Sequence, residues 1–209
     1  SGSQSYGDIV VLGADVALTA GGDVSFASFI GGARQLSITA GGHVGIADEV
    51  NVNGLSVDAG SFSAGAGVRT LDDLSLAVDA GGIGQVGAFV VGGDADFDAG
   101  AGDITLTHSD NDFQGLVSLA GDTVTINDTN GLQLDALATG ALSVASHGLL
   151  GLGSGTVAGT LAASSGGYSI GQDGPLSVAG TSTLDAGGAL IILDNAGNDF
   201  GGAVSLAGG

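Results

Sequence analysis

The chain has 209 residues, with 43 glycines, 22 acidic residues, two arginines and no lysine, so its formal net charge is −20. Such a balance excludes nucleic-acid and anionic-membrane binding, which need a basic face, and the lack of cysteine excludes disulfides, cysteine-ligated zinc and thiol chemistry. The apolar content of 44% argues against simple disorder, and no apolar run is long enough to predict a membrane span.

Short alternating segments recur along the chain, and most of them end at an Ala-Gly pair. Residues 16–19, 36–39, 55–58, 76–79 and 116–119 alternate apolar with small polar residues, as a strand with one buried face does. Ala-Gly pairs begin at Ala20, Ala40, Ala59, Ala80, Ala99, Ala120, Ala158 and Ala179, mostly 19 to 21 residues apart. Glycine interrupts nearly every ten-residue window, so little or no α-helix is expected.

A longer repeat contains the short one. Placing Phe113 on Phe200, an offset of 87 residues, aligns residues 83–121 with 170–208 and gives 20 identities in 39 positions. A coil of about 20 residues cannot close its own core, whereas stacked coils can share one. The sequence therefore predicts an all-β fold, a parallel β-helix (β-solenoid) of about ten rungs of roughly 20 residues each.

The predicted interior follows from the same alternation. Each inward residue should stack on its equivalents in neighbouring rungs, of this chain or of an identical one. The inward set comprises Val16, Leu18, Val24, Phe26, Leu36, Ile38, Val44, Ile46, Leu55, Val57, Leu76, Val78, Ile104, Leu106, Val117, Leu119, Val124, Ile126, Leu132, Leu134, Leu142, Val144, Val204 and Leu206.

The repeat text resembles a known family. The runs NDFQGLVSLAGDTVTIND and IGQDGPLSVAGTSTLDAGG, most clearly over residues 83–209, are similar to the repetitive shaft of filamentous-haemagglutinin-type bacterial exoproteins. The resemblance implies a right-handed β-helix, secretion by the two-partner or autotransporter route, and an extracellular location on the bacterial cell surface. It carries over no catalytic residue. Its matching positions are structural: Ile-Gly-Gln at Ile83 and Ile170, Asp-Ala-Gly at Asp98 and Asp185, and Asn-Asp-Phe at Asn111 and Asn198.

Domain organisation is expected to be simple. We find no linker between residues 1 and 209, and the sequence stops where another rung should begin. Residues 1–209 are therefore expected to form one continuous solenoid segment of a longer rod. Host or bacterial surface glycans would be partners of regions outside this chain.

The one metal candidate is an acidic strand. Asp94, Asp96 and Asp98 alternate with Ala95 and Phe97, so three carboxylates should share an outer face. Calcium would relieve their mutual repulsion, and a solvated acidic face is the alternative interpretation. No cofactor is otherwise expected.

Other motifs favour architecture over chemistry. Residues 82–87 spell GxGxxG, but no helix is expected after them, so a turn is the better interpretation than a dinucleotide site. His43, His108 and His147 are widely and unequally spaced, which is typical of isolated histidines rather than of a metal site. Thr105 and Thr107 form one Thr-x-Thr segment, and a second one begins at Thr123. In the aligned copy of the first segment Ile192 and Asp194 replace the two threonines, so a sustained threonine ladder is not expected.

The sequence favours a structural role over an enzyme. A lyase would need cations, of which this chain has only Arg34 and Arg69, both in its first third. No unique carboxylate pair can be singled out for a hydrolase. We therefore expect a shaft segment of a large secreted bacterial adhesin, which projects a binding tip and contributes to cell or surface attachment. A carbohydrate-binding or carbohydrate-cleaving β-helix and a self-assembling extracellular fibre subunit are the alternatives.

Overall fold

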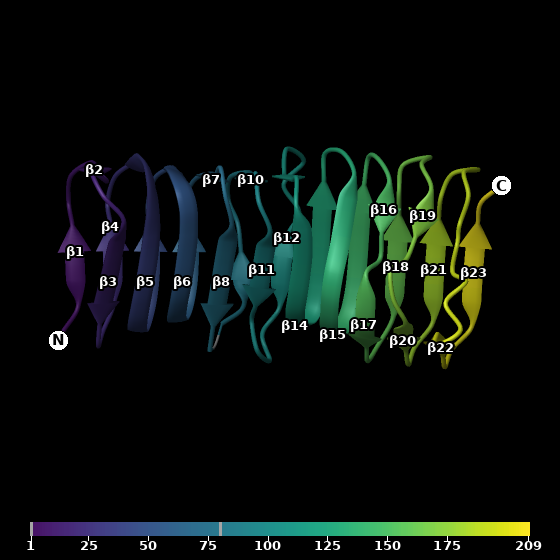
Figure 1. Cartoon of the computed structure of the whole chain (residues 1–209). Coiled ribbons are helices and arrows are strands. Elements are labelled where there is room, and N and C mark those ends of the chain that lie inside the picture. The colour runs from purple at the N-terminus through teal and green to yellow at the C-terminus, as the bar shows by residue number, and fades with distance from the viewer. Residues whose placement is uncertain (1, 80) are drawn as a thin grey trace.

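The computed structural model describes residues 2–79 and 81–209, and within them it contains strands and turns but no helix (Figure 1). None of the described residues forms a helix that could cross a membrane. The strands of the first half are β1 (Gln4–Tyr6), β2 (Val10–Val11), β3 (Val16–Ala20), β4 (Val24–Phe26), β5 (Ile30–Ile46), β6 (Val50–Ala64), β7 (Val68–Thr70), β8 (Leu74–Val78), β9 (Ile83–Gly84), β10 (Phe89–Val91) and β11 (Ala95–Asp98). Those of the second half are β12 (Ile104–Leu106), β13 (Asp112–Phe113), β14 (Leu116–Asp128), β15 (Leu132–Ser146), β16 (Leu150–Gly151), β17 (Ser154–Val157), β18 (Leu161–Ser164), β19 (Ile170–Gly171), β20 (Leu176–Val178), β21 (Ser182–Asp185), β22 (Asp199–Phe200) and β23 (Val204–Ala207).

Each strand pairs in parallel with the strand that lies one rung further along the chain. Gln4 pairs with Val24, and Val24 pairs with Val44, each 20 residues later. About ten such rungs stack into a rod with the two chain termini at opposite ends (Figure 1). The predicted parallel β-solenoid is confirmed.

Three stacks of strands form the walls of the rod, and we number them as faces 1, 2 and 3 in chain order. Face 1 comprises β1, β4, β9, β12, β18, β21 and β23, with residues 43–46, 61–64, 123–128 and 141–146 of the longer strands. Face 2 comprises β2, β7, β10, β13, β16 and β19, with residues 30–32, 50–52 and 132–134. Face 3 comprises β3, β8, β11, β17, β20 and β22, with residues 35–40, 54–59, 117–120 and 136–139.

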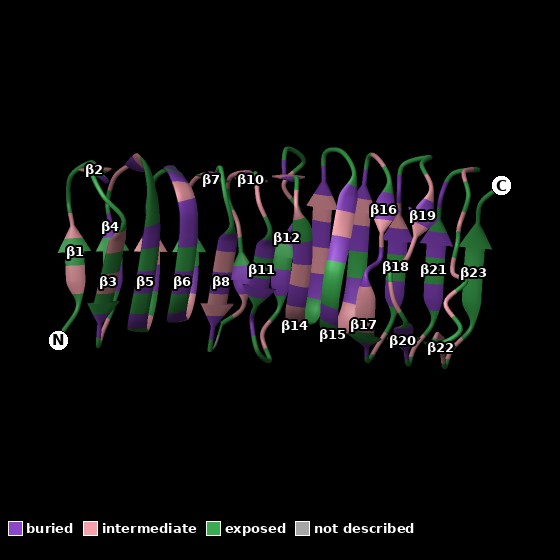
Figure 2. Ribbon diagram, viewed as in Figure 1, coloured by how far each residue is buried: buried purple, intermediate pink, exposed green. Residues whose placement is uncertain are grey.

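Burial alternates along the strands, as Figure 2 shows in purple and green bands. Most of the predicted inward set is buried, including Leu36, Ile38 and Ile104. Val16 and Leu18 are only half-buried in the first rung. The prediction was wrong for Val204 and Leu206, which are 43% and 55% exposed. They pair with Ser182 and Leu184 but have a neighbouring strand on one side only.

The strands of face 2 supply a part of the core that the sequence analysis did not identify. Ile30, Val50, Val68 and Phe89 form one buried column of this face. Its strand segments are only two or three residues long, which is too short for a clear alternation to mark them. Three phenylalanines fill the middle of the rod: the ring centroids of Phe89 and Phe97 are 6.3 Å apart, and those of Phe97 and Phe113 are 5.9 Å apart.

The Ala-Gly pairs lie where face 3 bends into face 1. Ala20, Ala40, Ala59 and Ala99 are buried there, whereas Ala80 lies outside the described residues. The glycines that follow permit close stacking of the chain, because a Cβ on Gly41 would come within 2.7 Å of the carbonyl oxygen of Gly21. The pair therefore marks a tight corner of the rod.

The two copies of the long repeat lie on different faces. Ile83 is on face 1, where it pairs with Ile104, whereas its copy Ile170 is on face 2, where it pairs with Leu150. Likewise Ala95 lies on face 3, whereas its equivalent in the second copy, Ser182, lies on face 1. An 87-residue repeat is thus four rungs plus one face, and the second copy is rotated by one face around the rod axis.

Because of this rotation, the sequence alignment compared threonine strands with residues that lie on a different face. Thr105 is on face 1, but its copy Ile192 flanks Ile191 on face 2. The true continuation of the Thr105 column runs through Thr125, Ser143, Ala162, Thr183 and Ser205. Small, uncharged residues therefore continue along face 1, although threonine itself does not.

Exposed apolar side chains are concentrated on one side of the rod. Apart from Val204 and Leu206 in the last rung, the large ones all lie on face 2 or at its two edges in the described chain. They are Ile9, Val11, Leu71, Val86, Leu116, Leu149, Tyr168, Leu190 and Ile192.

Candidate functional site

The acidic strand β11 has the predicted orientation. Asp94, Asp96 and Asp98 are exposed on face 3, while Phe97 points into the core. Burial raises the pKa of Asp96, and the nearby negative charge of Asp98 raises it further. The strand therefore concentrates negative charge at one place on the rod.

Two of these three carboxylates already have backbone partners. Asp94 Oδ1 accepts a hydrogen bond from the N–H of Leu116 in the next rung, and Asp98 Oδ1 accepts one from the N–H of Gly100. Across the described residues, no three histidine, aspartate or glutamate side chains are grouped so that they could hold a metal ion. Calcium binding at this strand stays a prediction.

The Asp98 contact shows what the Asp-Ala-Gly motif does. Gly100 has a φ of +55°, a left-handed conformation that glycine adopts without strain. In the second copy, Asp185 Oδ1 accepts from Gly187 N–H, and Gly187 has a φ of +58°. The motif is an aspartate-stabilised turn at both places.

Aspartates at the corners also join successive rungs. Asp23 Oδ1 accepts from the N–H of His43, Asp73 Oδ1 from Asp94 and Asp103 Oδ1 from Thr123, each 20 or 21 residues further on. A glycine often makes room for the carboxylate, since a Cβ on Gly42 would come within 2.2 Å of Asp23 Oδ1. This role, which the sequence analysis missed, gives a structural reason for the many aspartates and glycines.

The Ile-Gly-Gln and Asn-Asp-Phe motifs meet in space. Gln85 Nε2 donates to Asn111 Oδ1, and Asn111 Nδ2 donates back to Gln85 Oε1. Asn111 is fully buried, and its Oδ1 also accepts from the backbone N–H of Phe89. We call this pair the amide clamp; it recurs between Gln172 and Asn198 in the second copy.

A ladder of buried polar side chains continues from the clamp along the corner between faces 1 and 2. Asn111, Asp128, Ser146 and Ser165 occupy it in successive rungs, each at most 2% exposed. Asp128 accepts from the N–H groups of Phe113 and Asn130. Burial raises the pKa of the Asp128 carboxyl, while these two backbone hydrogen bonds oppose the rise. The ladder satisfies backbone donors at a corner where the strands separate.

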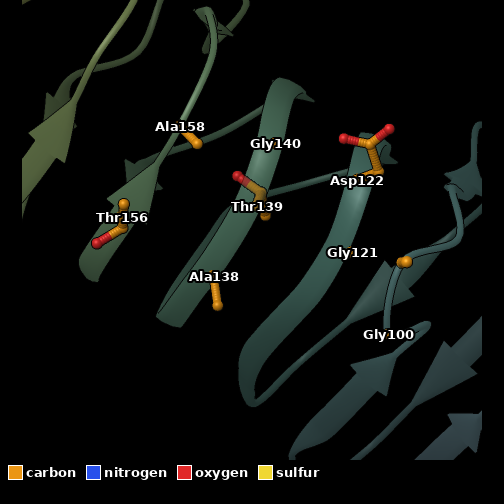
Figure 3. Close-up of a pocket in the computed structure, with 9 residues that line it drawn as sticks. Gly100, Gly121, Asp122, Ala138, Thr139, Gly140, Thr156 and Ala158 are labelled. Atoms are coloured by element: carbon orange, nitrogen blue, oxygen red, sulfur yellow. The ribbon is translucent and has the colours of Figure 1, made fainter.

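A groove lies where faces 3 and 1 meet, between β11 and β17, with a volume of about 490 Å³. Figure 3 shows Gly100 and Asp122 on one side, Thr139 and Gly140 in the middle, and Thr156 and Ala158 on the other side. Glycine, alanine and threonine form most of the lining, and Asp122 is its one carboxylate. Glycoside hydrolysis by the usual route needs two carboxyl groups, so this groove does not supply that chemistry.

The remaining motif residues have local structural partners. Gly82 of the GxGxxG segment has a φ of +73° and leads into β9, and no described residue after it is helical. The ring nitrogens of His43 bond to Ser61 and Ser63. Nδ1 of His108 accepts from Asp110 N–H, and Nδ1 of His147 lies 3.2 Å from the carbonyl oxygen of Asp128.

Comparison with known proteins agrees with the repetitive architecture. A family model described as repeats of unknown function (DUF5649) matches residues 55–120 and 139–207, together more than half of the chain. The two matched segments end 87 residues apart, which is the offset of the internal repeat. No curated protein and no solved structure matches the chain significantly.

Proposed function

The chain belongs to the DUF5649 family of repeats of unknown function, and we propose that it serves as a shaft segment of a large secreted bacterial surface adhesin. In this role it holds a binding tip away from the cell and contributes to attachment. The observation that carries the shaft proposal is the uninterrupted parallel stacking of about ten rungs. The resemblance of the repeat text to filamentous-haemagglutinin-type shafts supports the adhesin and its extracellular location.

Stiffness is what a shaft requires, and two features of the rod support it. Backbone hydrogen bonds join each rung to the next, as from Val10 to Phe29 and from Ile30 to Glu49. Among the described residues, one hydrophobic cluster extends from Leu12 to Ala186, so successive rungs share a core. In a solenoid, rung stabilities and neighbour contacts add along the axis, and bending must break several at once.

Surface charge supports the same role. The net charge of −20, with no lysine, makes most rod surfaces repel one another. Aspartates at the corners serve solubility and inter-rung bonding together, as Asp94 illustrates. A projecting rod needs both, because it must stay extended and must not collapse onto its neighbours.

Surface display tests the proposal. The chain is placed once or twice in tandem between an outer-membrane anchor and a small binding tip, and attachment to tip ligand beneath a polymer brush is measured. We expect two copies to reach through a brush that one copy cannot cross. A flexible glycine-serine linker of equal residue number is the control, and it should reach less far on average. Equal reach for both would contradict the proposal, and retention of the isolated chain on a glycan array would favour the carbohydrate-binding alternative.

A further inference from the structure

Outward residues at equivalent positions can differ between the two copies of the repeat, which lie on different faces of the rod. Asp96 lies on face 3, whereas the equivalent residue of the second copy, Thr183, lies on face 1. Thr105 lies on face 1, whereas its equivalent in the second copy, Ile192, lies on face 2. Interior positions such as Ile104 and Ile191 stay the same. Face 1 therefore carries mainly hydroxyl groups, and β11 places carboxylates on face 3 between Ser75 and Ser118. Most of the large exposed apolar side chains lie on face 2 or at its edges.

Face 2 has two apolar regions, one near each end of the rod. Ile9 and Val11 are 64% and 74% exposed in the first rung, and Leu71 is 62% exposed three rungs later. Leu149, Leu190 and Ile192 form the second region, 48% to 66% exposed. Shallow hollows lie beside both regions, one containing Val11 and Leu71 and the other containing Leu149 and Ile192.

Between these regions, face 2 carries a symmetric arrangement of charge. Arg69, Val90 and Asp112 are aligned outward in three successive rungs. Arg69 is one of only two cations in the chain. If a second copy lies antiparallel on this face with a two-fold axis at Val90, each Arg69 faces the Asp112 of the other copy. The same rotation places Ile9 and Val11 of one copy opposite the rung of Ile170 in the other, between the rungs of Leu149 and Ile192.

We propose that face 2 is a self-association surface, through which two copies of this chain pair side by side and antiparallel about Val90. This goes beyond the shaft role, because it gives the rod a lateral partner. A two-fold interface must be self-complementary, and the Arg69–Asp112 exchange satisfies that condition. Parallel pairing would instead place Arg69 against Arg69. Away from their edges with face 2, faces 1 and 3 of the described chain expose large apolar side chains only at Val204 and Leu206 in the last rung. Face 3 also carries the like charges of Asp94, Asp96 and Asp98.

The contact area is sufficient for a stable pair. Ten rungs at about 4.8 Å each give a length of about 50 Å, and a strand with its flanking residues is about 15 Å wide. Face 2 would thus bury about 700 Å² on each copy, close to the roughly 800 Å² per partner of a standard interface. Since each copy carries a charge of −20, added salt should strengthen the pairing by screening the repulsion.

Sedimentation equilibrium of the full chain at low and high salt tests the proposal, with circular dichroism to confirm that each variant is folded. We expect a monomer–dimer equilibrium whose Kd falls with salt. Val90→Asp should raise the Kd about 100-fold, since two carboxylates would meet at the axis. Thr105→Asp adds the same charge on face 1 and should leave the Kd unchanged. A wild-type chain that stays monomeric at about millimolar concentration in high salt overturns the proposal, as does a dimer that Thr105→Asp disrupts and Val90→Asp does not.

Charge exchange tests the antiparallel arrangement. Arg69→Asp should weaken pairing about tenfold or more, and Arg69→Asp combined with Asp112→Arg should restore it. Because the chain has no cysteine, Arg69→Cys gives a single thiol. In an antiparallel pair the two introduced thiols lie on opposite sides of the Val90 axis, so oxidation should not form a disulfide between the copies. Efficient self-linking, or a Kd insensitive to Arg69→Asp, would contradict the proposed arrangement.

Discussion

Gln85 and Asn111 bond to each other twice across the boundary between two rungs, with both nitrogen–oxygen distances at 2.8 Å. Asn111 also accepts from Phe89 N–H below it and donates to the carbonyl oxygens of Leu106 and Asn127. One buried carboxamide thus connects three successive rungs. The equivalent pair, Gln172 and Asn198, is bonded in the same way although it lies on a different edge of the rod.

Removing the clamp should destabilise the rod locally. Asn111→Ala leaves the N–H of Phe89 buried without an acceptor, so we expect the free energy of unfolding to fall by about 2 kcal/mol or more. Asn127→Ala is the control, because its side chain makes one hydrogen bond, to the carbonyl oxygen of Thr107. Denaturant unfolding measures both variants. Equal losses for the two would contradict the role given to the clamp.

The inter-rung aspartates predict a difference between two substitutions at one position. Asp94→Asn keeps an oxygen acceptor for Leu116 N–H, whereas Asp94→Ala removes it. We expect the alanine variant to be less stable than the asparagine variant by about 1 kcal/mol, the usual net value of one hydrogen bond. Comparing two variants of equal charge removes the electrostatic contribution. Equal thermal stability of the two would show that this hydrogen bond does not hold the rungs together.

The raised pKa values of Asp96 and Asp128 predict how stability depends on pH. A carboxyl with a higher pKa in the folded chain binds protons more tightly when folded. Its contribution to stability therefore grows as the pH falls and is lost as the pH rises through the folded pKa. We expect the free energy of unfolding to increase as the pH falls from neutrality toward 3.8, the ordinary pKa of an aspartate, measured by urea titration. Asp96→Asn should flatten this slope, and a stability that falls over the same range would refute the assignment.

Two glycines of one rung should respond very differently to alanine. Gly153 has a φ of +61°, and a Cβ there would lie 2.2 Å from the carbonyl oxygen of Asp135. At Gly151 the three atoms nearest to a Cβ all belong to the end of the Gln133 side chain, which can move at the expense of its hydrogen bond to Asp173. We expect Gly153→Ala to lower the free energy of unfolding by about 2 kcal/mol and Gly151→Ala to change it by less than about 0.5 kcal/mol. Similar melting temperatures for both variants would contradict the backbone geometry at Gly153.

Calcium titration decides the role of the acidic strand. Because Asp94 and Asp98 already accept backbone hydrogen bonds, we expect calcium to raise the melting temperature no more than magnesium at equal concentration. Asp96→Asn should respond as the wild type does. A stoichiometric calorimetric signal that Asp96→Asn abolishes would instead establish a calcium site.

The alternation of apolar residues predicted the core because a strand's inside and outside are fixed by a period of two. Leu36 and Ile38 illustrate this, since both are buried as expected. The face on which a residue lies could not be predicted, because rung length varies. Ala95 pairs with Val117, 22 residues later, whereas Leu137 pairs with Gly155, only 18 residues later. Residues 87 apart lie on different faces for a separate reason, because 87 residues exceed four rungs of about 20 by roughly one face.

The amide clamp left a signal in the sequence that the analysis did not use. Gln85 and Asn111 are 26 residues apart, and Gln172 and Asn198 have the same separation. Both are polar residues that stay identical in the two copies, which marks them as candidates for a structural role. The polar surface gave no comparable signal. Asp96 and Thr183 lie on different faces and have different neighbours, Ser75 and Ser118 for Asp96 and Ala162 and Ser205 for Thr183, which become known only when the rungs are stacked.

Solution scattering tests the central claim, that the chain is a stiff rod whose length is set by its number of rungs. Repeating residues 83–169 once in tandem should lengthen the rod by about 20 Å, at roughly 4.8 Å per rung, and should leave its cross-sectional radius unchanged. An increase in cross-section without an increase in length would show a globular packing of the repeats, and would contradict both the solenoid and its proposed role as a shaft.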